Sequence, residues 1–561
     1  MHPAFMQVLL QYWTQVFGDS ELSLRLPSTL FGLSAIVLTY VLGIKHFGRN
    51  AALFASAMLL FPVLPIIHST LARPYAPGLF FIVLLIFAIF RLEDSRVRSK
   101  YLTSSLLIII AASGSIYTHY YAGLCAGLIG ISALFYVKIR RWSFLIISGV
   151  IAVLLFLPHW SITQEHLSRD GLGWLGAPEW HWFWNYLKLY FGGNLWLSAL
   201  FMLLIPLGLI QSKFKSDNKA RFLLVTFIAL YFISHLISLL YTPILREPGV
   251  IMLMPLLLLG IGSFFKKIKS PIYNGALFSL SLVLVIGSVF QARLFETVHF
   301  EPFREMTALI KKYENDIGSD KLLKFCNVTN INYLNYYARR DGANLDFEMT
   351  MIEEIEEIHK LAAIIQKTDK PKVMLARTNR AQNVIQLEII RNKFPKIEVV
   401  VYFNNANFNI WSRGDFNDRN FLKTIDESSH PQYFMNWNCD STNNEFIGSL
   451  RIPVSELRHE ESYLLLRTDG WISEELNQLN FVVVAERDSV LIEQRGAAFL
   501  YQAWNQIALD ETRGCRRFYT AVELPEKLKD SDEIHVYFWN QNLAQVKIKK
   551  PRIYVVSKFD Q

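Results

Sequence analysis

The chain has 561 residues, of which 52% are hydrophobic and 19% charged, and its mean hydropathy is +0.24. A soluble chain of this length rarely lies so far on the apolar side, because it would lack the polar residues that cover a surface. This composition excludes a soluble cytosolic enzyme, and four cysteines without a CxxC pair exclude a disulfide scaffold.

Long apolar runs alternate with short polar ones up to about residue 292, and each run approaches the roughly 20 residues that span a bilayer. We therefore predict a polytopic α-helical membrane protein with about ten spans. Residues 1–23 precede them, and their apolar positions recur at spacings of three and four, typical of an amphipathic helix on the outer membrane surface. The predicted spans are 24–44, 51–71, 75–91, 102–118, 121–137, 142–158, 195–211, 221–241, 247–265 and 273–292. The pair within 102–137 can also be one kinked hairpin.

Lysine and arginine are distributed unequally between the predicted loops. Sixteen lie in the loops after the odd-numbered spans, and five lie in the loops on the opposite side. Because these residues accumulate in cytoplasmic loops, the richer side is predicted to be cytoplasmic, and both chain ends lie outside. The net charge of +8 then reflects membrane topology, and no nucleic-acid partner is implied.

Beyond residue 292 the chain has the pattern of a soluble protein that lies outside. Residues 293–404 alternate helical and strand patterns, which predicts a small α/β unit. Residues 405–561 contain short alternating strands, which predict a β-sandwich whose last strands resemble those of carbohydrate-binding jelly rolls. Such a module either holds glycan or shapes the entrance for an acceptor. Cys439 and Cys515 both lie in it and could pair.

Five motifs follow one another between residues 2 and 265: HPAFMQVLLQYWTQVFGDSELSLRLPSTLFG, GIKHFGRNAALFAS, FPVLPIIHSTLARPYAPGLFF, IYTHYYAG and REPGVIMLMPLLLLG. In this order they resemble motifs of bacterial polyprenyl-phosphate-dependent glycosyltransferases of the GT-C type, the group of protein mannosyltransferases and aminoarabinose transferases. The resemblance implies a GT-C-like membrane domain over residues 24–292.

The resemblance also implies a reaction. It is inverting transfer of a sugar from a polyprenyl-phosphate donor to a glycan, lipid or protein acceptor, on the outer face of the bacterial cytoplasmic (inner) membrane. In the family, an aspartate in the first outer loop acts as general base. That loop would precede Met1, so we expect a first transmembrane helix and its loop to be missing, and the catalytic base is unknown. The acidic residues at outer positions are Asp19, Glu21, Glu165, Asp170 and Glu179.

Three arginines are candidates for binding the donor phosphate. Arg25, Arg73 and Arg246 lie at the outer ends of predicted spans, although most lysine and arginine residues lie on the predicted cytoplasmic side. Arginine suits a phosphate because its planar fork donates hydrogen bonds in pairs and stays charged. Each side chain either binds the donor or reaches to the membrane interface.

Histidine and tyrosine side chains supply the other donor-binding candidates. His119, in the T-H-Y motif, could donate to a phosphate or a sugar hydroxyl, or it could be hydrogen-bonded between helices. Tyr75, Tyr120 and His2 stand in the matching motifs. No metal ligand is assigned, although a divalent metal remains an alternative because several histidines lie on the outer side: His2, His68, His159, His166 and His181.

Two other functions are compatible with these patterns. A transporter of lipid-linked sugars would also need many spans and outer basic groups, although internal pseudosymmetry is not evident. A catalytically inactive membrane scaffold or glycan-binding protein would fit the absence of the first loop. The predicted outer loop 159–194 contains five tryptophans, whose rings either stack on sugars or anchor the membrane interface.

Overall fold

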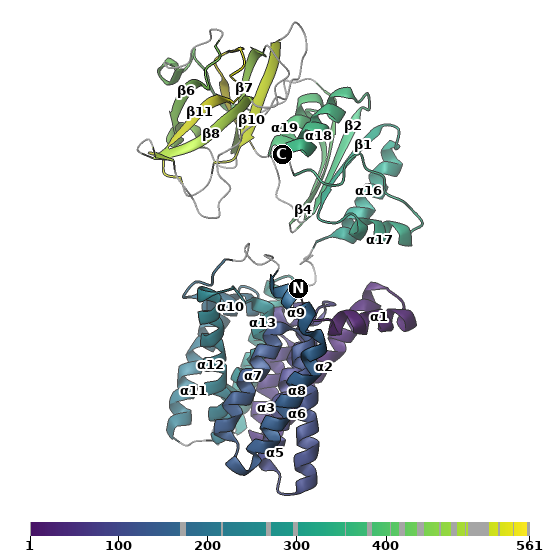
Figure 1. Ribbon diagram of the computed structural model, residues 1–561, viewed down its shortest axis with the longest axis vertical. Helices are drawn as coiled ribbons and strands as arrows, with labels where there is room; N and C mark the ends of the chain where they lie inside the picture. Colours follow the sequence, from purple (N-terminus) through teal and green to yellow (C-terminus); the bar gives the residue numbers. More distant parts are fainter. Residues whose placement is uncertain are drawn as a thin grey trace. The chain divides into compact units, whose positions relative to one another are not determined.

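The structure is a computed structural model of the chain, and it divides into two compact units, Met1–Glu296 and Thr297–Gln561 (Figure 1). The first unit is helical, and the second contains the β-sheets. The structure describes residues 2–168, 176–214, 217–264, 271–294, 301–353, 355–378, 384–403, 405–414, 421–434, 442–458, 462–472, 479–487, 490–491, 515–524, 528–541 and 543–557.

The first unit consists of helices joined by short connections. They are α1 (Phe5–Phe17), α2 (Glu21–His46), α3 (Arg49–Leu60), α4 (Val63–Ser69), α5 (Tyr75–Asp94), α6 (Arg98–Thr118), α7 (Tyr120–Tyr136), α8 (Trp142–Phe156), α9 (Trp160–Ser168), α10 (Trp182–Tyr190), α11 (Leu195–Phe214), α12 (Asn218–Leu240), α13 (Glu247–Val250), α14 (Met254–Gly262) and α15 (Pro271–Gln291).

Local sequence signals explain where several helices begin and break. Ser20 caps α2 by accepting a hydrogen bond from the Ser23 amide at 3.2 Å. Asp217 caps α12 in the same way, through the amide of Lys219 at 3.0 Å. Pro62 separates α3 from α4, which bend by 65° relative to each other, because proline has no N–H to continue the helical hydrogen bonds.

A single residue, His119, separates α6 from α7. The two helices come together closely beside this corner, because a Cβ on Gly123 of α7 would lie only 3.2 Å from Cα of Ile116 on α6. Glycine permits this approach of the two backbones. The corner therefore forms a tight helical hairpin, which corresponds to the kinked hairpin weighed from the sequence.

Each of the ten predicted spans falls on one of these helices or on a consecutive pair. Among the described residues, five helical segments are long and apolar enough to cross a membrane, and the bent pair α3–α4 makes a sixth if it counts as one span. Two shorter apolar segments, Tyr120–Tyr136 and Glu247–Gly262, correspond to two further predictions. The prediction of a polytopic helical membrane protein with sheets in its C-terminal region is confirmed, and the number of ten spans stays a prediction.

Helix α5 lies at the centre of the helical unit. Its side chains are buried on all sides, as Ile82, Ile86 and Ile89 illustrate, and it packs against α2, α6 and α7. In contrast, α6 exposes Leu102 and Leu106, an apolar face of the kind that lipid chains cover. Tyr75, the first residue of α5, therefore belongs to a helix that is held firmly by its neighbours.

The second unit begins with a small α/β arrangement, as predicted. Its sheet has the strand order β1-β2-β4-β3, in which β1 and β2 are parallel and the other pairs are antiparallel. Helices α16 and α17 pack on one face of the sheet, and α18 and α19 pack on the other. The sheet includes β4 and so extends beyond the boundary predicted at residue 404. The elements are α16 (Phe303–Ile317), β1 (Leu322–Val328), α17 (Asn332–Arg340), α18 (Ile355–Lys367), β2 (Lys372–Thr378), α19 (Val384–Lys393), β3 (Lys396–Phe403) and β4 (Ala406–Ser412).

A β-sandwich follows in the same unit. One sheet has the order β10-β7-β13-β5, with β12 also on β7, and the other has the order β6-β11-β8-β9. Alternating apolar side chains of both sheets, such as Leu464, Leu466, Val536 and Phe538, form the core between them. Cys439, the predicted partner of Cys515, lies outside the described residues. The elements are β5 (Phe421–Ile425), β6 (Phe446–Pro453), α20 (Val454–Leu457), β7 (Ser462–Ile472), β8 (Leu479–Arg487), β9 (Val490–Leu491), β10 (Cys515–Val522), β11 (Glu533–Asn540), β12 (Val546–Ile548) and β13 (Arg552–Ser557).

Candidate functional site

The turn between α4 and α5 carries Arg73. Helix α2 supports this turn from the side, since Ser28 Oγ donates to the carbonyl of Arg73 and Thr29 Oγ1 donates to the carbonyl of Ser69, each at 3.3 Å. A Cβ on Gly32 would lie 2.9 Å from Oγ of Ser69, so a larger residue there would press against the turn. The backbone of the turn is thus fixed, while the side chain of Arg73 is exposed.

Three imidazole rings surround Tyr75, the first residue of α5. The ring centroid of His68 lies 5.3 Å from that of Tyr75, that of His119 lies 5.7 Å away, and that of His2 lies 6.0 Å away. His2 and His119 also face each other, with centroids 4.5 Å apart. We call these four residues the histidine–tyrosine cluster. It joins the start of the chain, α4, α5 and the corner between α6 and α7.

Several polar atoms of the cluster are available to a ligand. Nδ1 of His119 accepts the amide hydrogen of Tyr121 at 3.0 Å, so the proton of the neutral ring sits on Nε2, which can only donate. Nδ1 of His2 and Nδ1 of His68 are buried and have no hydrogen-bond partner within the described part of the chain. Leaving such an atom unsatisfied costs about 1–3 kcal/mol, so the cluster favours a polar ligand or water.

The positive charge beside this cluster comes from Arg73. Burial is the main cause that lowers the pKa of His2 to about 4, and nearby positive charge, including that of Arg73, adds to the shift. His2 is therefore neutral at pH 7. A guanidinium together with neutral imidazole donors matches the needs of a phosphate, which accepts several hydrogen bonds and carries negative charge.

Tyr120, another predicted site residue, faces a neighbouring polar group. Its hydroxyl lies 2.9 Å from Nδ1 of His166 on α9. On the same helix, the hydroxyl of Thr163 lies 3.1 Å from Nδ1 of His159. The structure therefore directs Tyr120 towards α9, while its neighbour in the sequence, His119, joins the cluster.

The segment that begins with Arg246 packs beside the cluster. Arg246 is the N-cap residue of α13, and a Cβ on Gly249 three residues later would lie 3.1 Å from the ring of Tyr121. Further along, the side chain of Met252 fills the space left by Gly78, where a Cβ would lie 2.8 Å from Cε of the methionine. Gly78 is one turn after Tyr75 on α5. This packing brings the start of α13 towards the cluster.

Arg25 is placed differently from the other two arginines. It lies on α2, its side chain is exposed, and its carbonyl accepts a hydrogen bond from Thr29 at 3.2 Å. Within the described part of the chain, Arg25 is not among the residues that contact the cluster. The structure therefore groups Arg73 with His2, Tyr75 and His119, and it leaves Arg25 on the helix surface.

Two of the histidines considered as metal ligands, His2 and His68, lie in the cluster. Glu179 pairs with Nε2 of His181 at 2.7 Å, and Asp170 lies outside the described residues. Over the described ranges, no group of three His, Cys, Asp or Glu side chains is arranged to hold a metal ion. His68 was considered from the sequence only as a metal ligand, and the structure instead places it against Tyr75.

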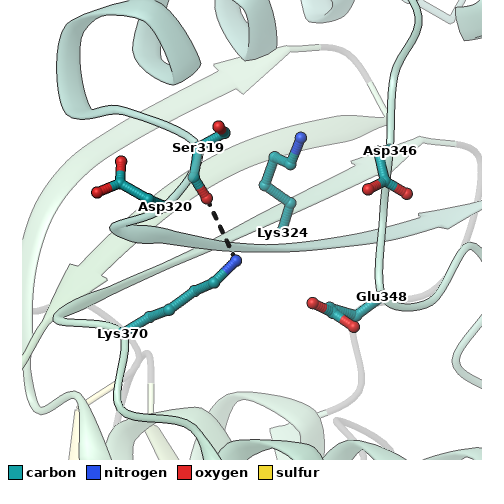
Figure 2. A pocket seen from close by; sticks show the side chains of 6 residues that line it. All are labelled: Ser319, Asp320, Lys324, Asp346, Glu348 and Lys370. Atoms are coloured by element: carbon teal, nitrogen blue, oxygen red, sulfur yellow. Dashed lines mark hydrogen bonds between the residues drawn. The ribbon is translucent and has the colours of Figure 1, made fainter.

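A separate pocket lies in the second unit, at the start of β1 (Figure 2). Nζ of Lys370 donates to the carbonyls of Ser319 and Leu322, each at 3.2 Å, and Lys324 pairs with Glu314. Both lysines are thus engaged in contacts within the fold, and all six side chains that line the pocket are polar or charged. It has a volume of about 240 Å³ and is lined by Ser319, Asp320, Lys324, Asp346, Glu348 and Lys370.

One protein-family model matches the segment that contains the cluster. Residues 1–162 match the family model described as dolichyl-phosphate-mannose-protein mannosyltransferase. The match covers 162 of the 561 residues of the chain. The resemblance to GT-C glycosyltransferases inferred from the motifs is thereby confirmed, and all four residues of the cluster lie within the matched segment. Arg246 lies beyond it. Among curated proteins, no sequence matches the chain.

Several solved structures of membrane glycosyltransferases are similar to the chain. ArnT from Cupriavidus metallidurans, in the apo state, is 12% identical, with 73% of this chain and 87% of that chain covered and a TM-score of 0.49. The arabinofuranosyltransferase AftD from Mycobacteria is 8% identical, with 98% and 53% covered and a TM-score of 0.41. The oligosaccharyltransferase of Archaeoglobus fulgidus, tethered with an acceptor peptide, is 8% identical, with 99% and 88% covered and a TM-score of 0.40. The agreement with the sequence motifs therefore rests on the family model of residues 1–162.

Proposed function

We propose that this protein is a membrane glycosyltransferase that moves a sugar from a polyprenyl-phosphate donor to an acceptor on the outer face of a bacterial cytoplasmic membrane. The observation that carries the proposal is the histidine–tyrosine cluster, with Arg73 beside it and buried imidazole nitrogens that lack partners among the described residues. The description of the matching family, which names a dolichyl-phosphate sugar, supports a donor of this class.

The cluster suits the phosphate of such a donor. Arg73 can pair with two phosphate oxygens, and Nε2 of His119 can donate to a third oxygen or to a sugar hydroxyl. His2 and Tyr75 lie against His119 and complete the polar surface. We include Tyr120, Arg246 and Arg25 as further contacts of the donor or its tail.

The reaction is an inverting displacement. The oxygen of an acceptor hydroxyl attacks the anomeric carbon, the bond from that carbon to the phosphate oxygen breaks, and the polyprenyl phosphate leaves with the bonding electrons. The proton of the hydroxyl passes to a general base, which we do not assign to a residue of this chain. Arg73 and His119 would stabilise the negative charge that grows on the departing phosphate, which is the usual role of fixed donors at such a position.

The test is a transfer assay with the purified full chain in lipid nanodiscs. Synthetic polyprenyl-phosphate sugars serve as donors, a set of envelope glycans, lipids and peptides serves as acceptors, and mass spectrometry detects the product. We expect transfer from at least one donor, and a loss of transfer in His119→Ala. His119→Gln keeps a donor group and should retain part of the activity.

A matched control is Lys311→Ala in the second unit, which removes an exposed ion pair with Asp341 and should leave transfer unchanged. Transfer at the wild-type rate by folded His119→Ala protein would refute the placement of the phosphate site. Absence of transfer with every donor would refute the enzymatic proposal. Movement of the lipid-linked sugar across the bilayer without transfer would favour a transporter, and neither activity would favour a scaffold.

A further inference from the structure

The two sheets of the β-sandwich differ in what covers their outward faces. On the outward face of the sheet with β7 and β10, Tyr463 packs against α19, where its hydroxyl contacts Glu388 and accepts a hydrogen bond from Arg391 at 3.0 Å. The other sheet faces away from α19, with β6, β11 and β8 side by side (Figure 1). Its outward face on β6 and β11 presents side chains to solvent.

This face carries a row of aromatic rings. Side chains on β11 alternate strictly, so that Val536 and Phe538 enter the core while Tyr537 and Trp539 point outward. Phe446 on β6 lies opposite Trp539 in the strand register and is 57% exposed. The rings of Phe446 and Trp539 are within 14° of parallel, with centroids 6.4 Å apart, and Tyr537 meets Phe446 at 5.9 Å.

A chain of hydrogen bonds lies next to the aromatic row. Oγ of Ser449 is 3.0 Å from Nε2 of His535, and Nδ1 of the same ring is 2.8 Å from Glu486. Nε of Arg451 donates to the second oxygen of this carboxylate at 3.1 Å. Burial disfavours the charged carboxylate, yet the hydrogen bonds from His535 and Arg451 outweigh this effect and hold the pKa of Glu486 below its usual value.

A β-bulge places the serine in this chain. The register of β6 against β11 shifts between Val536 and Phe538, and Gly448 adopts a φ of +73°, which is the left-handed conformation that glycine tolerates. The bulge inserts an extra residue between Ile447 and Leu450, so that Phe446 and Ser449, three positions apart, both project on the outward side with His535. The polar groups are thereby held in fixed positions before any ligand arrives.

We propose that this outward face of β6 and β11 binds a saccharide chain. The planar surfaces of Phe446, Tyr537 and Trp539 would contact the C–H faces of the sugar rings. The hydroxyl of Ser449 and the guanidinium of Arg451 would bind sugar hydroxyls, and His535, whose two ring nitrogens contact Ser449 and Glu486, would hold both groups in place. Sugars present both apolar C–H faces and hydroxyl groups. Outward-facing aromatic rings beside fixed polar groups match this chemistry, whereas an apolar protein surface would leave the polar groups unused.

The binding site is independent of the proposed transfer, and its test needs no enzymatic activity. The full chain in detergent, carrying a fluorescent label, is applied to an array of bacterial polysaccharides and of oligosaccharides of glucose, galactose, mannose and N-acetylglucosamine. We expect saturable binding to at least one of these glycans. Trp539→Ala should weaken it by roughly tenfold, because truncating a central aromatic contact has an effect of this size, and Trp539→Tyr should retain most of it.

Two further variants separate binding from folding. Tyr402→Ala removes another exposed aromatic side chain, on β3, and should leave glycan binding unchanged. Phe446→Ala can replace Trp539→Ala as a test, because Phe446 is exposed on an edge strand and its removal should leave the fold intact. Phe446→Ala should show the same loss of glycan binding. Absence of binding to every glycan on the array overturns the proposal. Wild-type affinity of the folded Phe446→Ala protein also overturns it.

Discussion

Replacing Arg73 by alanine removes the guanidinium beside the histidine–tyrosine cluster while the turn that carries it stays in place. The hydrogen bonds that position this turn involve backbone groups, since Ser28 Oγ donates to the Arg73 carbonyl and the Arg73 amide donates to the carbonyl of Leu71 at 2.7 Å. The side chain itself is exposed. The substitution should therefore change ligand binding with little effect on folding.

The magnitude follows from the lost contact. A hydrogen bond that involves a charged group contributes about 1.5–3 kcal/mol, and each 1.4 kcal/mol is about a tenfold change in an equilibrium. Use of a polyprenyl-phosphate sugar by Arg73→Ala should thus fall by roughly tenfold to a hundredfold at subsaturating donor. Arg73→Lys keeps the charge but loses the paired donors, so it should recover only part of the loss.

The assay measures initial transfer rates over a range of donor concentrations, normalised to folded protein in nanodiscs. Thermal unfolding of each variant in the same nanodiscs checks that the fold is intact. Arg25→Ala provides the matched comparison, since it removes an exposed arginine of α2 that the described contacts do not link to the cluster, and its effect should be smaller. Equal losses for Arg73→Ala and Arg25→Ala, or no loss for either, would refute the reasoning.

Three other predictions test packing, charge and topology. Gly43→Ala should lower the unfolding temperature, because its Cβ would lie 2.5 Å from the backbone of α3, whereas Gly127→Ala, with open space around it, should maintain or raise that temperature. Hydrogen bonds from two neighbouring serines lower the pKa of Asp426 to about 2, so its contribution to stability is present at neutral pH. That contribution is lost as the pH falls from the usual aspartate pKa of 3.8 towards about 2, and thermal unfolding of Asp426→Asn should depend less on pH over this range. In a chain without its native cysteines, Ser319→Cys should react with an impermeant maleimide in cells with a permeabilised outer envelope, and Ser99→Cys should not; the reverse would contradict the predicted orientation.

Much of the fold could be predicted because its signals are local. Apolar runs of span length indicate the membrane helices, and a strictly alternating strand such as β11 indicates a half-buried sheet. The boundary after residue 404 was placed too early for the α/β sheet, because β4 is completed by pairing with β2 and β3, which are distant in the sequence. Pairing of this kind leaves no local pattern.

Three of the four residues of the histidine–tyrosine cluster were candidates from the sequence, and their arrangement was not predicted. The motifs drew attention to His2, Tyr75 and His119, which the structure brings together. The contact of His68 with Tyr75 depends on the bend at Pro62 and on the support of the following turn by α2, and neither follows from the spacing of the residues. The separation of Tyr120 from its neighbour His119 likewise depends on the single-residue corner between α6 and α7.

The most direct test of the central claim measures binding of the phosphate without any chemistry. The wild-type chain and the double variant Arg73→Ala/His119→Ala are titrated in detergent with undecaprenyl phosphate and, separately, with undecaprenol, and thermal stabilisation is followed. We predict that the phosphate stabilises the wild type more than the alcohol does, and that the double variant loses this difference. Equal stabilisation of the wild type by both lipids, or an unchanged difference in the double variant, would contradict the assignment of the cluster as the phosphate site.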